Sequence, residues 1–580
     1  MEVCFESLSV TAPFSGKQLL DNVSGRFLPG ELTGILGPSG AGKSTLLNAI
    51  SGYRRSGVNG HIMAGTRKSR CYIGQEDLLA PFMTTGELMD FASRLKLPSN
   101  YTSKQRAVII DELLHHLGLE KCIDTRTECL SGGQKKRLSI ALELINNPSI
   151  IFLDEPTSGL DIVTAGVLIR LLSKLSQTGR TIVVTIHQPS ATLFALFDKV
   201  YFLAEGKCIY QGGPGAHLVH FLEQNNFICP TNFNPADYLI EIVEDDKNTI
   251  QLLSDATENG KVSWYSKDVA IKTSTENADV DNINLSLLTS DPFIQNRSRD
   301  CTSFWLQFTV ILSRIILQGK RNKAGLKIHF LHYTICAFVV STLFYQTANN
   351  GSEFTAHLRL CISLILFHSY SQQMAPVVYY PFEVKLLKRE HFNQWYSLLP
   401  YYLALKLSKI PILTLLLWFH TLAVYYSSGL PWELYRFTLF FAVSLVTSFV
   451  ALALGLTIGA LFNATNGSII GAMILSPILG LACYGFDFMR TVPLFMQIIV
   501  RFSFMRSGVY ALVLIIYSLN RQPLKCPEEI IHCHFSDPKV ALYFLDLQDV
   551  DIWKPIGDLM INLFFFWLAF YLALRWRLRS

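Results

Sequence analysis

The sequence lacks several features that would place it in a common class of protein. Its twelve cysteines include no C-x-x-C pair, which excludes the usual zinc-site and thioredoxin-like redox spacings. Its net charge is only +5 over 580 residues, so nothing in the charge balance indicates a nucleic-acid partner. No signal peptide precedes the first strand-like segment, Val3 to Val10, and we therefore expect the N-terminal half to remain in the cytosol.

Charged residues are scarce, at 16% of the chain, and they are unevenly distributed. Residues 1–300 have the mixed composition of a soluble α/β protein, whereas residues 328–578 contain several long apolar runs. Runs of about 20 apolar residues are long enough to cross a bilayer. The sequence therefore predicts a soluble domain followed by a membrane domain.

One glycine-rich stretch fits the phosphate-binding pattern G-x-x-x-x-G-K-[ST] in full. An apolar strand-like segment precedes it and helix-like turns follow, which is the context that this motif requires. Backbone N–H groups of such a loop surround phosphates, its lysine reaches the β- and γ-phosphates, and its serine ligates Mg²⁺. We therefore predict ATP and Mg²⁺ as ligands of Gly37, Pro38, Ser39, Gly40, Ala41, Gly42, Lys43, Ser44 and Thr45.

Four further polar motifs follow this loop, and three of them stand at the ends of predicted strands. Gln75 ends one strand, Asp154 and Glu155 end the next, and His187 ends a third. The fourth motif is the run Leu130-Ser131-Gly132-Gly133-Gln134. In this order the motifs resemble the nucleotide-binding domain of the ATP-binding-cassette (ABC) transporters.

The resemblance implies a role for each of these positions. Asp154, with Ser44 and Gln75, would hold Mg²⁺; Glu155 would be the general base; Gln75 and His187 would contact the γ-phosphate. The signature residues Ser131, Gly132, Gly133 and Gln134 would close over ATP held by a second subunit. The aromatic residue that stacks on adenine in this family is not at its usual place, and Phe5 or Phe14 could substitute for it.

The predicted domain order is an ABC ATPase domain of α/β P-loop fold followed by an all-α domain with six spans. We place the ATPase domain at residues 1–244, a flexible polar linker at 245–300, a cytosolic connecting helix at 301–327 and the membrane domain at 328–580. A seventh apolar run, 494–517, is interrupted by Arg501 and Arg506, and we interpret it as re-entrant or interfacial. The six predicted spans are about 328–346, 358–378, 401–427, 434–462, 469–488 and 556–575.

The distribution of basic residues predicts that the nucleotide domain lies in the cytosol. These residues stand beside the first span, between spans two and three, and at the C-terminus. The loop 490–554 is then outside, where Cys526 and Cys533 would either form a disulfide or stay as two free thiols. Asn350 begins an N-glycosylation sequon, Asn350-Gly351-Ser352, in the first outer loop.

The order of nucleotide domain before membrane domain resembles the G subfamily, the white and sterol-exporter group. Asn234 to Tyr238 and Arg389 to Ser397 resemble stretches of that branch, and so do outer-loop residues near Cys526. The resemblance implies a half-transporter in the plasma membrane or an endosomal membrane, dimerising with itself or with a relative. ATP hydrolysis would drive export of a sterol or another lipophilic molecule. Pigment precursors or hormones are the alternative cargo, and an ATP-gated membrane regulator that transports nothing is a different class.

Relatives bind cargo on the dimer axis, between spans two and five, against an aromatic residue of span two. Tyr370 is at the matching place here. His368, Gln372 and Gln373 put polar groups in the same span, and polar groups in a bilayer usually face a cavity or another helix. We therefore expect a flat lipophilic cargo that also forms hydrogen bonds; the alternative is that these residues only join helices together.

Overall fold

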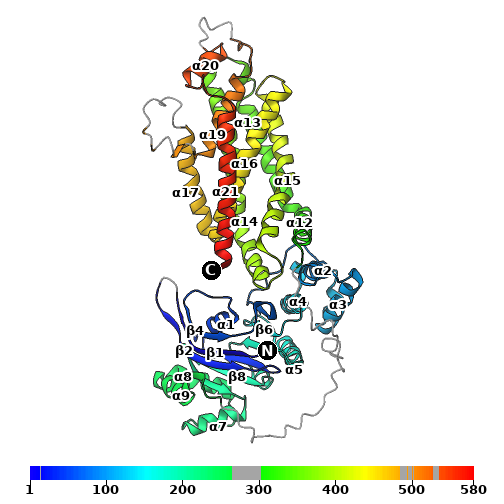
Figure 1. The fold of residues 1–580 in the computed structure, drawn as a ribbon, viewed down its shortest axis with the longest axis vertical. Helices are drawn as coiled ribbons and strands as arrows, with labels where there is room; N and C mark the ends of the chain where they lie inside the picture. Colours follow the sequence, from blue (N-terminus) through cyan, green and yellow to red (C-terminus); the bar gives the residue numbers. More distant parts are fainter. Residues whose placement is uncertain are drawn as a thin grey trace. The chain divides into compact units, whose positions relative to one another are not determined.

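A computed structural model describes residues 1–12, 15–263, 302–483, 502–526 and 535–579, together with residues 493, 495, 499 and 500 (Figure 1). The chain divides into two compact units. The first contains residues 1–314 and 386–401, and the second contains residues 315–385 and 402–579. Each unit is described by itself below.

The first unit is built on two sheets. A three-stranded antiparallel sheet has the order β2-β1-β4, and a six-stranded sheet has the order β5-β6-β7-β3-β8-β9. In the larger sheet β3, β5, β6, β7 and β8 are parallel and β9 is antiparallel. The central strands β3, β6 and β7 are fully buried, as expected for parallel strands covered on both faces. The strands are β1 (Val3–Thr11), β2 (Gln18–Phe27), β3 (Leu32–Leu36), β4 (Val58–Met63), β5 (Arg70–Ile73), β6 (Ile150–Leu153), β7 (Thr181–Thr185), β8 (Lys199–Ala204) and β9 (Lys207–Gly212).

The helices of this unit begin at residues that satisfy free backbone N–H groups. Thr84, Thr102 and Ser131 each form a capping box. The side-chain oxygen of the N-cap residue accepts from the N3 backbone N–H, and the N3 side chain accepts from the N-cap backbone N–H. The helices are α1 (Lys43–Ser51), η1 (Arg67–Ser69), α2 (Thr85–Lys96), α3 (Ser103–His116), η2 (Glu120–Cys122), η3 (Thr127–Cys129), α4 (Gly132–Leu144), α5 (Ile162–Gln177), α6 (Ala191–Phe194), α7 (Ala216–Gln224), α8 (Pro235–Asp245), α9 (Lys247–Ala256) and η4 (Glu258–Gly260), followed by most of α12 (Phe304–Arg321).

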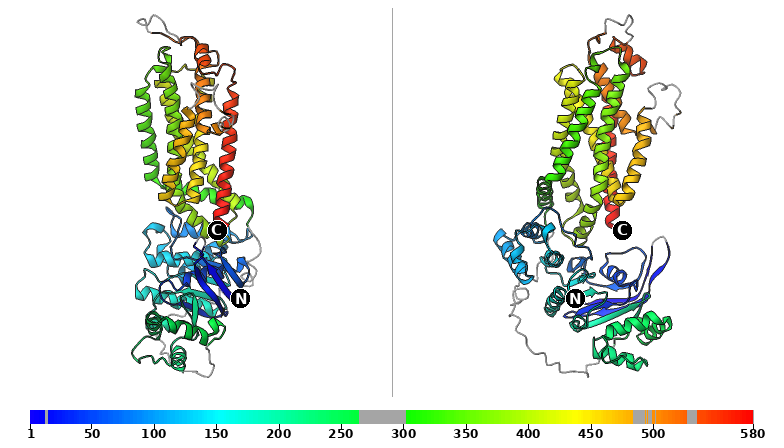
Figure 2. Two further views of the ribbon diagram at one scale, coloured as in Figure 1. Left: turned by 90° about the vertical axis from the view of Figure 1, so that its left-hand side faces the viewer. Right: turned by 180° about the vertical axis from the view of Figure 1, so that it is seen from behind.

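The second unit is helical, and its helices lie side by side in a bundle (Figure 2). Helix α16 packs against α17, α19 and α21 and supplies much of the buried core. Helix α19 is only 14 residues long and is almost entirely buried; at 1.5 Å per residue it spans about 21 Å, less than the bilayer core of about 30 Å. The helices are α13 (Lys323–Leu343), η5 (Thr347–Asn349), α14 (Phe354–Phe392), α15 (Leu398–Ser427), α16 (Leu434–Leu461), α17 (Ala464–Cys483), α19 (Phe504–Tyr517), α20 (Pro538–Phe544) and α21 (Trp553–Arg579).

Five described helices are long and apolar enough to cross a membrane: α13, α15, α16, α17 and α21. The second of the six predicted spans, 358–378, lies within α14, which has 39 residues. Its polar residues, among them His368, Gln372 and Gln373, keep it below the apolarity of the other five. The seventh predicted run corresponds in its second half to the short helix α19.

The prediction of a flexible linker from residue 245 is wrong for its first part. Residues 247–256 form α9, which begins at the side-chain cap of Asp246 and buries Ile250 and Leu253. Helix α9 packs on β9, and Thr257 donates a hydrogen bond to the Cys208 carbonyl at 3.2 Å. The polar composition of this stretch is that of an amphipathic surface helix rather than of a loop. Residues 264–301 lie outside the described residues.

Candidate functional site

The glycine-rich loop joins β3 to α1. Gly37 has φ 141°, and a Cβ there would lie 2.0 Å from the carbonyl oxygen of Leu203, so only glycine fits at this point of close backbone approach. Gly42 is the N-cap of α1, has φ 102° and supplies no side-chain cap. The N–H groups at the start of α1 therefore remain available to an anion.

Lys43 is folded back over this loop. Its Nζ donates to the carbonyl oxygens of Gly37 and Pro38, both at 2.8 Å, and its side chain is 6% exposed. Burial lowers the pKa of Lys43, and the nearby carboxylates of Glu155 and Asp154 oppose that effect. The amine is thus held at the loop with two carboxylates close to it.

Three hydroxyl groups converge on Asp154. Ser44 Oγ donates to Asp154 Oδ1 at 2.8 Å, Thr185 Oγ1 donates to the same oxygen at 2.7 Å, and the Tyr72 hydroxyl donates to Oδ2 at 3.2 Å. Burial raises the pKa of Tyr72, and the Asp154 carboxylate raises it further, so the phenol remains a donor. These contacts come from α1, β7 and β5, and they fix the carboxylate beside the loop serine.

Glu155 is held in a left-handed backbone conformation directly after Asp154, with φ 43°. Its N–H donates to Thr185 Oγ1 at 2.8 Å, and Gln75 Nε2 donates to its Oε2 at 2.9 Å. Thr185 thus bonds to both acidic residues, a role that the sequence alone did not indicate. His187 lies exposed just beyond the end of β7. Parallel strands bring the side chains predicted at their carboxyl ends to one edge of the sheet.

The signature run begins α4. The Ser131 side chain accepts from the Gln134 N–H at 3.3 Å, and Gln134 Oε1 accepts from the Ser131 N–H at 2.9 Å. Lys136, two residues further on, donates to the carbonyl oxygens of Gly74 and Gln75 at 3.3 and 2.9 Å and pairs with Asp77 at 3.0 Å. It is 2% exposed and ties α4 to the segment that carries Gln75. In the sequence, the only sign of this role for Lys136 is its position beside the signature run.

Phe5, one of the two residues offered as a substitute for the adenine-stacking aromatic, does not suit that role. Phe5 is 1% exposed and packs in the core, with ring centroids 5.6 Å from Phe27 and 5.9 Å from Tyr201. The alternation of β1 turns this residue inward, where no ligand can reach it. Phe14 lies outside the described residues.

Residues 386–401, here called the coupling segment, belong to the first unit and form a buried ionic network with it. Glu143 is fully buried and pairs with Lys96 at 2.7 Å and with Arg389 at 3.5 Å. Trp395 Nε1 donates to the same carboxylate at 3.3 Å. The Asn393 side chain accepts from the Tyr72 N–H at 3.0 Å and donates to the Tyr72 carbonyl at 2.9 Å. It thus occupies the hydrogen-bonding groups of Tyr72 on the edge strand β5.

A second buried ion pair joins the coupling segment to α12. Arg314 donates to both oxygens of Glu390 at 2.7 and 2.9 Å, and the Tyr396 hydroxyl also donates to Glu390. This bidentate geometry is the strongest form of a guanidinium–carboxylate contact. The resemblance drew attention to Arg389–Ser397, but only the folded chain identifies the partners of this segment.

In the second unit, Tyr370 is 53% exposed, whereas His368 and Gln373 are fully buried. Gln373 Nε2 donates to the Gly471 carbonyl of α17 at 2.8 Å, and Gln372 donates to the Tyr333 hydroxyl of α13. The two glutamines therefore join α14 to α13 and α17. Tyr370 and Gln372 do not face each other, because residues two apart on a helix lie on different sides.

The predicted outer-loop features lie beside one another. Cys526 is disulfide-bonded, and its predicted partner Cys533 lies outside the described residues. Lys525 pairs with Asn350 in an isolated bridge, with the Gly351 N–H donating to the Lys525 carbonyl at 2.9 Å. The sequon and the disulfide thus lie at the same end of the second unit.

Comparison with known proteins gives the same two parts. The family model for "ABC transporter" matches residues 20–158, and models for "ABC-2 type transporter" match residues 306–517 and 187–271. ABC transporter G family member 14 of Arabidopsis thaliana is 31% identical over 466 residues, which cover 77% of this chain and 71% of the relative. Protein white of Drosophila melanogaster is 28% identical, over 98% of this chain and 84% of the relative. The Caenorhabditis elegans ABC transporter ATP-binding protein/permease wht-1 is 29% identical, over 86% of this chain and 77% of the relative.

A phosphate loop, strand-end carboxylates and a signature helix in one α/β domain, followed by a helical domain with membrane-spanning character, define an ATPase coupled to transmembrane transport. Such a protein binds and hydrolyses ATP in the first unit and is embedded in a membrane through the second. The chain belongs to the ABC transporter G family.

Proposed function

We propose that this chain is one half of a dimeric exporter of sterols or other lipophilic molecules, with its nucleotide domain in the cytosol. The observation that carries the proposal is the fixed geometry around Asp154, where Ser44, Thr185 and Tyr72 hold one carboxylate beside the phosphate loop. That geometry suits nucleotide hydrolysis, because phosphoryl transfer needs positioning and charge stabilisation rather than covalent chemistry.

The residues beside the loop fit Mg²⁺. Ser44 Oγ and Asp154 Oδ1 are oxygen donors 2.8 Å apart, and Mg²⁺ prefers such oxygens together with substrate phosphates. When bound, Mg²⁺ would neutralise charge on the β- and γ-phosphates. Lys43 would donate to phosphate oxygens in place of the Gly37 and Pro38 carbonyls. Gln75 would contact the metal and the γ-phosphate.

Glu155 would orient and deprotonate the attacking water. Its backbone is fixed by Thr185, and its side chain bonds to Gln75 at 2.9 Å. His187 would contact the γ-phosphate from the end of β7. Each of these groups would contact phosphate, metal or water, so we assign them the catalytic roles.

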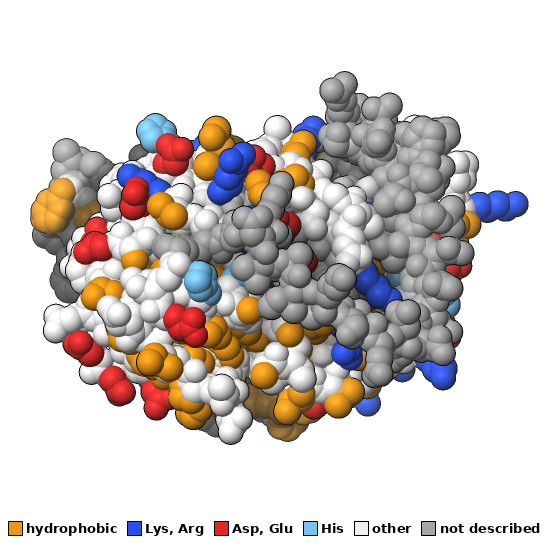
Figure 3. All heavy atoms as spheres, turned by 90° about the horizontal axis from the view of Figure 1, so that it is seen from below, with side chains coloured by type: hydrophobic (Ala, Val, Ile, Leu, Met, Phe, Trp, Pro, Cys, Tyr) orange, Lys and Arg blue, Asp and Glu red, His pale blue; other side chains and the backbone are white. Residues whose placement is uncertain are grey.

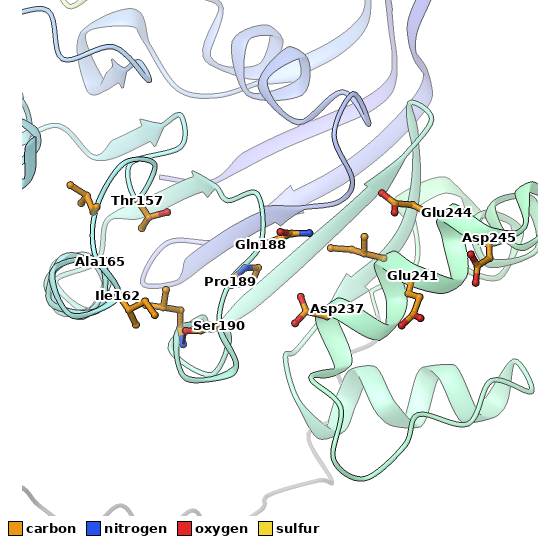
Figure 4. A pocket seen from close by; sticks show the side chains of 13 residues that line it. Thr157, Ile162, Ala165, Gln188, Pro189, Ser190, Asp237, Glu241, Glu244 and Asp245 are labelled. Carbon is orange, nitrogen blue, oxygen red and sulfur yellow. Dashed lines mark hydrogen bonds between the residues drawn. The ribbon is translucent and has the colours of Figure 1, made fainter.

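Dimerisation is supported by the surface beside α5. Ile162 and Val163, directly after Asp161, are 71% and 73% exposed, and a pocket of about 630 Å³ lies next to them. Its walls come from α5, from the segment Gln188 to Ser190 and from α8, with Asp237, Glu241, Glu244 and Asp245 along one side (Figure 4). On the one face drawn in Figure 3, hydrophobic, acidic and basic side chains all reach the surface. A second copy that covers Ile162 and Val163 would remove this apolar surface from water.

The face proposed for cargo is formed by α14 and α17. Tyr370, Val378 and Phe382 are exposed on one side of α14, at intervals of eight and four residues that keep them on one face. On α17, Ile469 and Met473 are exposed in the same way. The two helices are joined by the Gln373–Gly471 hydrogen bond, so their exposed apolar sides border one another. A flat lipophilic molecule against Tyr370 suits this surface.

Reconstitution tests the proposal directly. Purified chain in proteoliposomes should move a fluorescent sterol or lipid probe when ATP is supplied, and that cargo should stimulate its ATPase. The Glu155→Gln variant in the same liposomes is the matched control for passive leakage. ATPase activity with no movement of any lipophilic probe would instead favour the ATP-gated regulator.

A further inference from the structure

Three arginines lie together where α1 ends and β5 begins. Arg55 follows α1, Arg67 is the first residue of η1 and Arg70 is the first residue of β5. Arg70 is packed over Gly52, where an added Cβ would lie 2.8 Å from its Nη2. The guanidinium of Arg67 lies 5.4 Å from the ring centroid of Phe392, a residue of the coupling segment. All of these residues belong to the first unit.

Among the described residues, no carboxylate forms an ion pair with Arg67 or Arg70, and the Nε atom of each is buried with no hydrogen-bond partner. Burial lowers the pKa of both guanidinium groups, and the charge of Arg55 lowers it further. His391 lies in the last turn of α14. Burial lowers the pKa of His391, and the nearby charge of Arg67 lowers it further. Half-buried cations that repel one another are normally paired, and a bound anion would satisfy this group.

The arginine group also borders the ATP site through stacked aromatic rings. Tyr53, which follows α1, stacks on Tyr72 at a centroid distance of 4.5 Å, and Phe392 lies edge-on to Tyr53 at 5.1 Å. Tyr72 bonds in turn to Asp154. An anion held by the arginines would therefore contact the ring cluster that positions the carboxylate proposed to hold Mg²⁺.

The position in the chain indicates which anions can reach the group. The predicted second span ends near residue 378, and α14 continues without interruption to Phe392. In the sequence, His391 follows the end of the predicted second span by 13 positions, on the side that the proposed function places in the cytosol. Basic groups on the cytosolic side of a span attract anionic lipids, and arginine matches phosphate by bidentate hydrogen bonds.

We propose that Arg55, Arg67 and Arg70, with His391, form a binding site for a multiply charged phosphate group. The phosphate is carried either by the headgroup of a polyphosphorylated lipid or by a free polyphosphate. The site rests on the cytosolic orientation in the proposed function, but binding to it requires no cargo and no transport. Occupancy would neutralise the repulsion and hold η1 against the end of α14.

The test uses the full chain in nanodiscs, with the phosphate loop saturated by a non-hydrolysable ATP analogue so that the two anion sites are distinguished. Discs of phosphatidylcholine alone, with a few mole per cent phosphatidylinositol bisphosphate, or with phosphatidylserine matched in total charge form the lipid arm. Soluble inositol trisphosphate added to the phosphatidylcholine discs forms the free-anion arm. Thermal stabilisation of the protein reports binding in both arms.

We expect stabilisation by the bisphosphate lipid or by inositol trisphosphate, and not by phosphatidylserine. The Arg67→Gln/Arg70→Gln variant should bind roughly ten- to a hundredfold more weakly, because two charge-assisted contacts are lost. The control Lys104→Gln/Lys121→Gln removes the same charge from exposed positions on the same unit and should bind as the wild type does. Arg55 is exposed, so Arg55→Gln gives a readout if the double variant does not fold.

Stabilisation in the lipid arm alone identifies a headgroup site, and stabilisation by the soluble headgroup identifies a site for free polyphosphate. Equal stabilisation of the wild type and of both arginine variants, or none in either arm, would overturn the proposal. Failure of transport with normal lipid binding would instead count against the proposed function.

Discussion

At the scale of single residues, the site is organised around one carboxylate that three hydroxyl groups hold. Asp154 could not keep one orientation by itself, since a carboxylate at a strand end rotates freely. Thr185 restrains both Asp154 and Glu155 from the neighbouring strand, and Tyr72 reaches Asp154 from the other side. Restraint of this kind is what positions charge for phosphoryl transfer before the nucleotide arrives.

The first prediction concerns Glu155. Replacing it with glutamine keeps the size of the side chain and the contact with Gln75 but removes the base. We expect ATPase activity to fall by about 10²–10⁴-fold, while ATP binding is retained. Turnover of radiolabelled ATP and the binding of a fluorescent ATP analogue measure the two effects; turnover near the wild-type rate would remove Glu155 from the role of base.

At the scale of elements, the coupling segment is held in the first unit by charges rather than by apolar burial alone. Glu143 of α4 pairs with both Lys96 of α2 and Arg389 of the segment, and Arg314 of α12 pairs with Glu390. Because α4 begins with the signature residues and also contacts the Gln75 segment through Lys136, one helix joins three functional parts. The segment continues directly into α14 and α15.

The second prediction follows from this network. Glu143→Gln would leave two buried cations without a full partner, and losing one member of a buried pair costs about 3–5 kcal/mol. We expect a marked fall in the thermal unfolding midpoint of the detergent-solubilised protein. Glu223→Gln, on the exposed side of α7, is the control of equal charge and should unfold as the wild type does; an unchanged midpoint for Glu143→Gln would show that the network is not structural.

The third prediction concerns α14. Tyr370→Ala should abolish the stimulation of ATPase by cargo, because it removes the aromatic surface proposed to stack on it, and should leave basal ATPase and surface expression largely intact. Phe338→Ala, at a 69% exposed aromatic of α13, is the matched control. Stimulation that survives Tyr370→Ala for every transported compound would place the cargo elsewhere.

At the scale of the whole molecule, the chain contains one phosphate loop and one signature helix. In the proposed dimer each ATP lies between the loop of one subunit and the signature of the other. Each subunit then supplies half of each site. ATP binding would favour the closed arrangement of the two nucleotide domains, and hydrolysis would favour the open one.

The fourth prediction tests this division between subunits. Lys43→Ala removes the loop amine and Ser131→Arg blocks the signature, so homodimers of either variant contain no intact site. A mixed dimer contains one, since the intact loop of one subunit faces the intact signature of the other. Co-expression with two affinity tags and tandem purification should therefore recover part of the ATPase. Full activity of the Ser131→Arg chain by itself would contradict the facing arrangement.

The sequence by itself determined the fold of the first unit and most of its site. Patterns of local origin were sufficient there: a glycine loop between strand and helix, and polar residues at the ends of apolar strands. Parallel strands bring such ends to one edge, so order along the chain predicted proximity in space. Five of the six predicted apolar runs overlap described helices that are long and apolar enough to cross a bilayer.

Other features were decided only by tertiary structure. Residues 247–256 read as a polar linker, yet packing on β9 makes them helix α9. Phe5 looked available to adenine until the pairing of β1 turned it into the core. The partners of Glu143, 47 and 246 residues away in sequence, could not be found from spacing, since long-range ion pairs leave no periodic signal. The same holds for the three arginines: each reads as an ordinary surface charge, and only the fold places them together.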